Sequence, residues 1–259
     1  TQTTATGENI AIGNEAMRLN TSGSSQVAVG HKALFANTTG GSNTAVGHSA
    51  LLTNTTASSN TALGTAALRL NTTGSSNTAV GHQAMDSNTT GFENVVSGYR
   101  ALYNNTTGDT NTAIGTEALR DNQTANDNTA VGKSALLSNT TGSNNTAVGR
   151  GALDASTTGT INTAVGFDAL GANTTGSQQV AVGRNALKLN TTATANTAVG
   201  TSALSAVTTN GGNTAVGGDC LKSSTGANNT AVGYQASLSN TSGENNVAVG
   251  QGALDTNST

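Results

Sequence analysis

Three histidines are the residues in this chain best suited to metal binding or acid–base chemistry. His31, His48 and His82 each follow a glycine directly, and their spacing of 17 and 34 residues places them at the same point of a repeated motif. Other repeats carry Thr, Lys, Arg, Tyr, Phe or Gly at this point, a tolerance that indicates an exposed site. His31 and His48 lie in adjacent repeats and could share a metal ion, but no ladder of carboxylates or cysteines accompanies them. We therefore expect no metal site and no cofactor.

Catalysis needs converging groups of unlike type, such as a nucleophile beside a base, and the repeated motif supplies none. Calcium-binding β-rolls need aspartates at regular spacing, whereas the acidic residues here are scattered. The single cysteine, Cys220, cannot form an internal disulfide and stands where other repeats carry alanine, so we interpret it as a buried substitute for alanine. The sequence predicts no catalytic residues, and we expect a protein that is not an enzyme.

Asn-x-Ser/Thr triplets form the most prominent surface motif, and two interpretations of them remain open. Stacked Asn and Thr side chains can hydrogen-bond along a corner and cap backbone groups. The same triplets are acceptors for N-glycosylation, and we expect them at an exposed corner. The candidate glycan acceptors are Asn20, Asn37, Asn54, Asn71, Asn88, Asn105, Asn122, Asn139, Asn173, Asn190, Asn240 and Asn257.

All of these residues belong to one tandem repeat, whose consensus is Asn-Thr-Ala-Val-Gly-x-x-Ala-Leu-x-x-Asn-Thr-Thr-Gly-Ser-x. Fifteen copies follow one another at intervals of 17 residues, except for one interval of 16. The glycines that mark the copies are Gly13, Gly30, Gly47, Gly64, Gly81, Gly98, Gly115, Gly132, Gly149, Gly166, Gly183, Gly200, Gly217, Gly233 and Gly250. Self-similarity of this kind is the signature of a repeat architecture.

The period of 17 residues is too short for a helical hairpin and lacks the leucine pattern of leucine-rich repeats. Thr, Asn and Gly prefer strands, turns and caps to helices. The sequence therefore predicts an all-β chain, a single parallel β-solenoid over residues 1–259 with one coil per repeat. One coil buries too few aliphatic groups to fold alone, so the coils must stack. We expect the chain to be a segment or a subunit of a longer fibre.

Each coil is predicted to begin with a short strand, as at residues 43–46. Alternation of side chains places Thr44 and Val46 on one face and Ala45 on the other. Aliphatic residues replace both Thr44 and Val46 in other repeats, so we expect these two ladders to form the core. Leu51 and its equivalents add a third apolar ladder.

Two corners and an outward alanine complete the predicted coil. Gly47 marks a corner that needs backbone freedom. The second corner lies at residues 54–57, where Ala57 replaces the usual glycine and argues against an obligatory positive φ. The outward alanine recurs in fourteen of fifteen repeats, Val96 being the exception. It indicates either close packing with a local corner or a flat seam against a neighbouring chain.

Composition excludes several classes of protein. With 33 glycines, no proline, 2% aromatic and 9% charged residues, the chain is neither an ordinary globular domain nor typical of disorder. The ten Lys and Arg are scattered singly, so we expect no basic stripe and no nucleic-acid partner. No apolar run is long enough to span a membrane, and we find no secretory signal or initiator Met, which suggests a processed product or a fragment.

A family resemblance follows from the motifs at residues 8–13 (Glu-Asn-Ile-Ala-Ile-Gly), 26–30 (Gln-Val-Ala-Val-Gly) and 246–250 (Asn-Val-Ala-Val-Gly). They resemble the head repeats of trimeric autotransporter adhesins, the YadA-like left-handed parallel β-roll, and related phage tail-fibre and surface proteins. The resemblance implies a left-handed coil, a homotrimer and a role in adhesion at a cell surface or on a fibre. These repeats are longer than the usual head repeat, and no coiled-coil stalk or membrane anchor is present.

We expect a structural fibre or adhesin-shaft segment, extracellular or on a virion, that associates with itself as a homotrimer or end to end. Two alternatives remain: an adhesive head or tail-fibre segment that binds a surface glycan or receptor, and an ice-binding solenoid. An adhesive surface should show local departures from the repeat. The candidate contact patch, which drift within one repeat also explains, is Phe92, Tyr99, Arg100 and Tyr103.

Overall fold

The computed structural model describes residues 7–256, which form strands and turns and contain no helix. The chain divides into two compact units, residues 7–128 and 129–256. The first unit holds β1 Asn9–Ile12, β2 Gln26–Val29, β3 Thr44–Val46, β4 Thr61–Leu63, β5 Thr78–Val80, β6 Val95–Ser97 and β7 Thr112–Ile114. The second unit holds β8 Thr129–Val131, β9 Thr146–Val148, β10 Thr163–Val165, β11 Val180–Val182, β12 Thr197–Val199, β13 Thr214–Val216, β14 Thr230–Val232 and β15 Val247–Val249.

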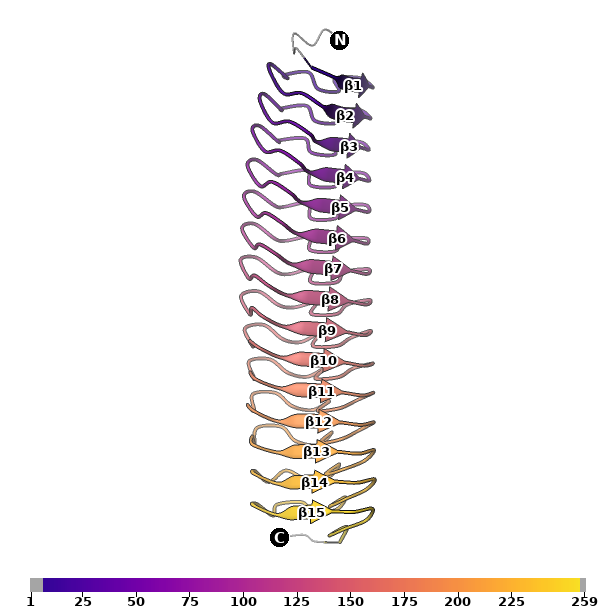
Figure 1. Cartoon of the computed structure of the whole chain (residues 1–259), viewed down its shortest axis with the longest axis vertical. Coiled ribbons are helices and arrows are strands. Elements are labelled where there is room, and N and C mark those ends of the chain that lie inside the picture. Colours follow the sequence, from indigo (N-terminus) through magenta and orange to yellow (C-terminus); the bar gives the residue numbers. More distant parts are fainter. Residues whose placement is uncertain (1–6, 257–259) are drawn as a thin grey trace. The chain divides into compact units, whose positions relative to one another are not determined.

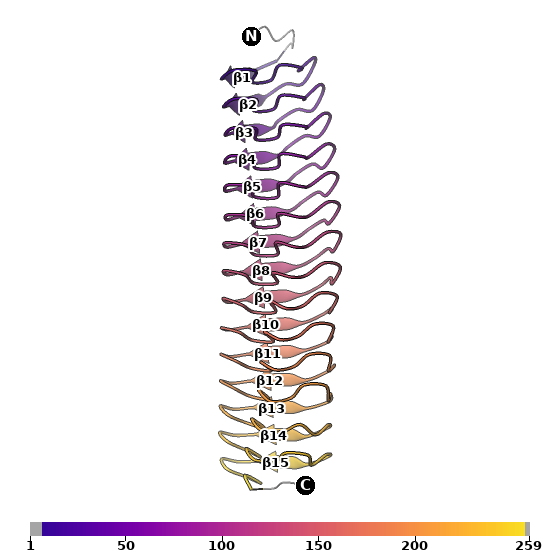
Figure 2. The ribbon, with the colours of Figure 1, turned by 180° about the vertical axis from the view of Figure 1, so that it is seen from behind.

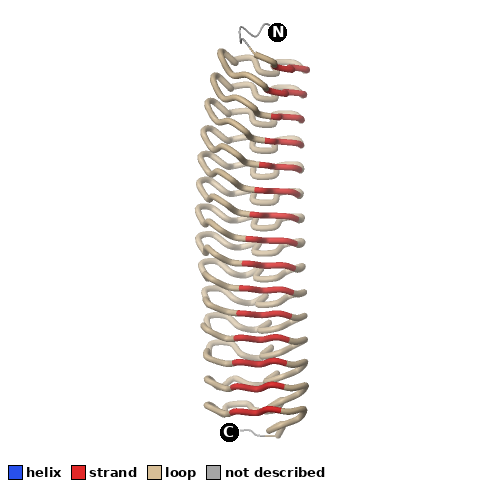
Figure 3. The backbone as a smooth tube through the Cα atoms, viewed as in Figure 1, coloured by secondary structure: helices blue, strands red, loops and turns tan. Residues whose placement is uncertain are grey.

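Within each unit, every strand pairs in parallel with the next strand along the chain (Figure 1). The register has no offset: Ala45 lies beside Ala62 in the first unit, and Ala164 lies beside Ala181 in the second. Each coil contributes one strand and then returns through turns (Figures 2 and 3). The prediction of an all-β parallel solenoid with one coil per repeat is confirmed. A single array over the whole chain and a left-handed coil stay predictions.

The alanine of each strand, replaced by Val96 in β6, lies inside the coil, so the predicted facing of the strands is wrong. Ala45 is fully buried, whereas Thr44 and Val46 on either side of it are only partly buried. The interior is narrow and is filled by Ala45, Ala50 and Leu51 and their equivalents. A methyl group fits this space, which explains why alanine recurs. Close packing accounts for the uniformity, and the hypothesis of an outward alanine seam is wrong.

The turn after each strand carries unusual backbone angles. Gly47 has a φ of 139°, and an added Cβ would lie 2.4 Å from the carbonyl oxygen of Gly64, so glycine is required there. Ser49 and Leu51 follow with φ of 57° and 50°, a left-handed conformation that the sequence does not predict. This conformation accompanies the turn that places the Leu51 side chain in the core. The third apolar ladder is thus confirmed.

Candidate functional site

The asparagines of the Asn-x-Ser/Thr triplets are buried, so the prediction that they lie at an exposed corner is wrong. The buried acceptors are Asn20, Asn37, Asn54, Asn71, Asn88, Asn105, Asn122, Asn139, Asn173, Asn190 and Asn240. The twelfth candidate, Asn257, lies outside the described residues. The folded coils leave no room for a glycan on these buried side chains.

In the first unit these asparagines form a ladder of amide hydrogen bonds, here called the amide ladder. Nδ2 of Asn54 donates to Oδ1 of Asn37 at 2.9 Å, and also to the carbonyl oxygen of Ala57 at 3.0 Å. The same bond between neighbouring amides recurs from Asn20 to Asn122 without a gap. This arrangement supports the interpretation that the triplets are structural, since buried amides need partners.

In the second unit the amide ladder is interrupted. Ser156, Val207 and Ser224 replace asparagine, and all three side chains are buried. Neither polar atom of the Asn190 amide has a hydrogen-bond partner. Most repeats carry asparagine at the position of Gln179. Nε2 of Gln179 donates to the carbonyl oxygen of Ala193. In other coils the equivalent of Asn190 donates to this carbonyl, as Asn54 does to that of Ala57. In the first unit the equivalent carbonyl accepts from both asparagines, as that of Ala57 does from Asn43 and Asn54, whereas at Ala193 only the bond from Gln179 is present.

Three of the four residues of the predicted contact patch lie together. The guanidinium carbon of Arg100 lies 5.4 Å from the ring centroid of Tyr99 and 5.2 Å from that of Tyr103. Nε of Arg100 donates to Oε1 of Gln83 at 2.9 Å. Phe92 is also exposed but lies near the second corner of its coil, with no ring contact among the residues that the structure describes. The structure therefore assembles a smaller patch than the sequence predicts.

The histidines form stacked pairs with their neighbours along the coil axis. The rings of His31 and His48 are 5.1 Å apart with an interplanar angle of 21°, and His82 stacks on Tyr99 at 5.6 Å. Within residues 7–256 no group of three or more His, Cys, Asp or Glu side chains is placed to hold a metal ion.

The outward face of the strands is a surface that the sequence analysis missed. We define this strand face as the side chains on either side of the buried alanine in each strand. It consists of Thr, Val, Ile and Leu with one serine, Ser97, and no described strand carries a charge on it. The most exposed aliphatic side chains are Ile10, Ile12, Leu63, Val95 and Ile114 in the first unit and Val199, Val216, Val232, Val247 and Val249 in the second. Exchange of Thr with Val and Ile, which suggested a core, instead marks an outer apolar face.

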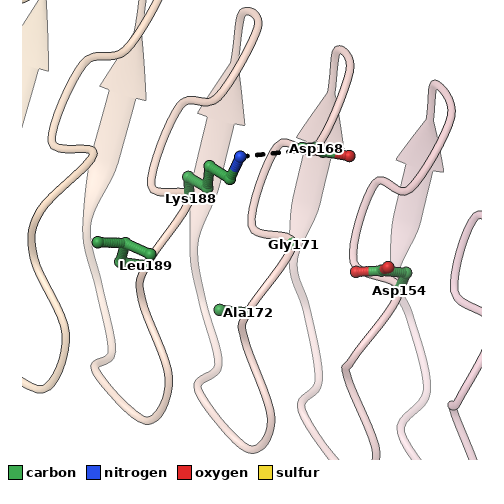
Figure 4. A pocket seen from close by; sticks show the side chains of 6 residues that line it. All are labelled: Asp154, Asp168, Gly171, Ala172, Lys188 and Leu189. Carbon is green, nitrogen blue, oxygen red and sulfur yellow. Dashed lines mark ion pairs between the residues drawn. The ribbon is translucent and has the colours of Figure 1, made fainter.

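A pocket of about 250 Å³ opens on the second unit. Figure 4 shows its lining, which is Asp154, Asp168, Gly171, Ala172, Lys188 and Leu189. Nζ of Lys188 lies 3.5 Å from Oδ2 of Asp168. Burial, and then the nearby charge of Asp168, raises the pKa of Asp154. Asp154, Gly171 and Lys188 occupy the same position in three successive coils. Because Gly171 has no side chain, the space between Asp154 and Lys188 stays open. The pocket presents an ion pair and a second carboxylate to solvent.

Cys220 is fully buried, which confirms that it takes the place of a core alanine. Its Sγ lies 3.3 Å from the carbonyl oxygen of Ala231, and burial raises its pKa to about 11. A thiol with so high a pKa is a poor nucleophile at neutral pH.

Comparison with known proteins adds no family to these observations. Among the described residues, no helix is long and apolar enough to cross a membrane. No protein-family model matches the chain. No curated protein matches it either.

Proposed function

We propose that this chain is a non-enzymatic structural segment of an extracellular fibre or filament, and that it associates with itself through the strand face. The observation that carries the proposal is the uncharged row of exposed and half-buried Val, Ile and Leu side chains on that face. Contiguous exposed apolar surface in soluble proteins marks sites of association. The homotrimer implied by the resemblance to adhesin heads is one form of this association.

The composition of the coil interior supports the same proposal. Each coil buries mainly two alanines and one leucine, so its own apolar burial is small. Covering the strand face with a second copy would add the aliphatic side chain of Val148 and its equivalents to the buried surface. Because every strand has the same register, two copies can pack along the whole face.

Native mass spectrometry of wild type and of a Val148→Lys/Val165→Lys variant tests the proposal. The control is Thr158→Lys/Thr175→Lys, which adds the same charge to the same two coils at exposed threonines near the second corner. We expect an oligomer for wild type and control, and a folded monomer for the strand-face variant. A wild-type chain that stays monomeric at high concentration would contradict the proposal.

Ice binding is a second candidate, because the strand-face threonines lie outward and not in the core as expected. Thr hydroxyls and Val methyls repeat at about 4.8 Å between coils and about 6.6 Å along a strand. Such a regular array could order water into an ice-like layer. Thermal hysteresis measured on wild type separates the two candidates, since self-association through the same face would abolish it.

A further inference from the structure

Three cations of the second unit fall on one row, although the cations look singly scattered in the sequence. Lys133, Arg150 and Arg184 each follow the corner glycine of a coil, and Phe167 occupies the same point in the coil between Arg150 and Arg184. We call these four residues the cationic ladder. No acidic residue stands at this point in any of the fifteen repeats. The prediction that the chain has no basic stripe is therefore wrong for this unit.

Backbone hydrogen bonds fix the ladder residues in adjacent coils. The carbonyl oxygen of Lys133 accepts from the amide of Gly151, and that of Arg150 accepts from the amide of Asp168. The guanidinium carbon of Arg150 lies 5.7 Å from the ring centroid of Phe167. Since one coil advances by about 4.8 Å, the ladder spans roughly 14 Å.

The ladder cations differ from the other two cations of the second unit. Lys188 and Lys222 pair with Asp168 and Asp219 at 3.5 Å and 3.0 Å. Lys133, Arg150 and Arg184 are exposed and make no ion pair among the described residues. Like charges held in a row repel one another and favour a ligand that brings several negative charges.

The nearest carboxylates do not neutralise the positive charge of the cationic ladder. Asp168 is engaged by Lys188, and Asp154 lies half-buried in the pocket. Over residues 133–189 there are four cations and two carboxylates, whereas the whole chain has a net charge of −3. The positive charge is thus local to these coils.

We propose that the cationic ladder binds a linear anionic polysaccharide, with carboxylate or sulfate groups along the row and a sugar ring against Phe167. An extended polyanion can meet all three cations because they follow one line. Arg offers paired donors to carboxylate and sulfate, and Phe167 offers an apolar face to the C–H groups of a sugar. A single aromatic side chain is too few for the stacking of successive bases, which favours a polysaccharide over a single-stranded nucleic acid. The proposal rests on the ladder residues alone and does not require self-association through the strand face.

Titration calorimetry with polygalacturonate and with heparin tests the ladder. The test variant is Lys133→Gln/Arg150→Gln/Arg184→Gln, and the control is Arg18→Gln/Lys32→Gln/Lys222→Gln. The control removes three charges that already have carboxylate partners. Circular dichroism checks that both variants fold. A third variant, Phe167→Thr, introduces the residue found at this point in other repeats, as at Thr201.

We expect wild type and control to bind at least one polyanion, and the ladder variant to lose about tenfold or more in affinity. The slope of log affinity against log salt should be about −2 for wild type and near zero for the ladder variant. Phe167→Thr should weaken binding without changing the salt slope. Equal losses in ladder variant and control, tighter binding of oligo-dT than of either polysaccharide, or no binding at low salt would each overturn the proposal.

Discussion

The two units share one coil geometry but differ in how they satisfy the amides inside it. In the first unit the amide ladder runs unbroken from Asn20 to Asn122, whereas in the second unit Ser156, Val207 and Ser224 interrupt it. Strand register is the same in both. Backbone hydrogen bonds and the alanine–leucine core are therefore enough to define the coil, and the amide ladder adds stability to a fold already specified.

Buried polar atoms without partners should weaken the second unit. In that unit the amide of Asn190 and the hydroxyls of Ser156, Ser224 and Ser237 lack partners. Each such atom costs about 1–3 kcal/mol relative to a satisfied one. We expect faster amide hydrogen exchange in residues 129–256 than in residues 7–128, because local opening follows local stability.

The corner glycine is common to both units, and replacing it should have the largest effect on the stability of each. Gly64→Ala and Gly166→Ala place a Cβ 2.4 Å and 2.5 Å from the carbonyl oxygens of Gly81 and Gly183, at φ of 135° and 138°. We expect each to destabilise its unit by about 4 kcal/mol, measured by urea unfolding and localised by hydrogen exchange. A tolerated alanine in either unit would show that the corner can relax.

Replacing one asparagine in each unit tests the amide ladder directly. Asn71→Val removes bonds to Asn54, Gly74 and Asn88, and we expect a loss of about 3 kcal/mol. Asn190→Val removes an amide that has no partner, beside the buried Val207, and we expect no loss or a gain of up to about 1 kcal/mol. The two substitutions are chemically identical, so equal losses in thermal unfolding would mean that the ladder contributes nothing beyond volume.

A third difference concerns one exposed position of strained backbone. Ile161 has a φ of 59°, which is costly for a β-branched residue, while Asn144 takes nearly the same φ one coil earlier. We expect Ile161→Asn to stabilise the second unit by about 1 kcal/mol, measured by urea unfolding. Thr110→Asn in the first unit should give less, because the Thr110 hydroxyl donates to Asp127 at 2.6 Å. A smaller gain at Ile161 than at Thr110 would contradict this ranking.

The sequence predicts the coils well and the direction of their side chains poorly. The 17-residue period fixes the parallel solenoid, and the need for glycine at Gly47 and the burial of Leu51 are also predicted. The facing of Thr44 is wrong because exchange with valine suits an apolar outer face as well as a core. The nearly uniform alanine is the better signal, since a position that holds alanine in all but one repeat is a crowded one.

The candidate surfaces depend on alignment between coils more than on any single motif. The cationic ladder could have been found in the sequence, because Lys133, Arg150 and Arg184 are separated by multiples of 17. The burial of the asparagines could not, since an Asn-Thr-Thr corner with its amide inside has the same sequence as one with its amide outside. Only the closure of the coil decides between them.

The smallest effect on stability is expected at two aspartates that occupy the same position of the repeat in the two units. Asp86 in the first unit is buried and receives two hydrogen bonds of 2.8 Å from Arg69. Asp154 in the second unit has Leu137 in the place of that arginine, and burial raises its pKa above the ordinary 3.8. Folding therefore disfavours the ionised form of Asp154. Its unfavourable contribution to the free energy of unfolding is absent at a pH below its pKa in the unfolded chain, and it grows as the pH rises towards its pKa in the folded protein.

Removing the charge at these two positions should have opposite signs. At neutral pH we expect Asp154→Asn to stabilise the second unit by about 0.5 kcal/mol, and this gain should vanish in acid. Asp86→Asn should destabilise the first unit, because it leaves Arg69 without its partner. Leu137→Arg should reproduce the pair of the first unit and lower the pKa of Asp154, as read by NMR titration of its carboxyl carbon. If Asp154→Asn instead lowers stability at neutral pH, the ionised Asp154 carboxylate has favourable partners in the pocket. The second unit would then be more stable than its interrupted amide ladder indicates.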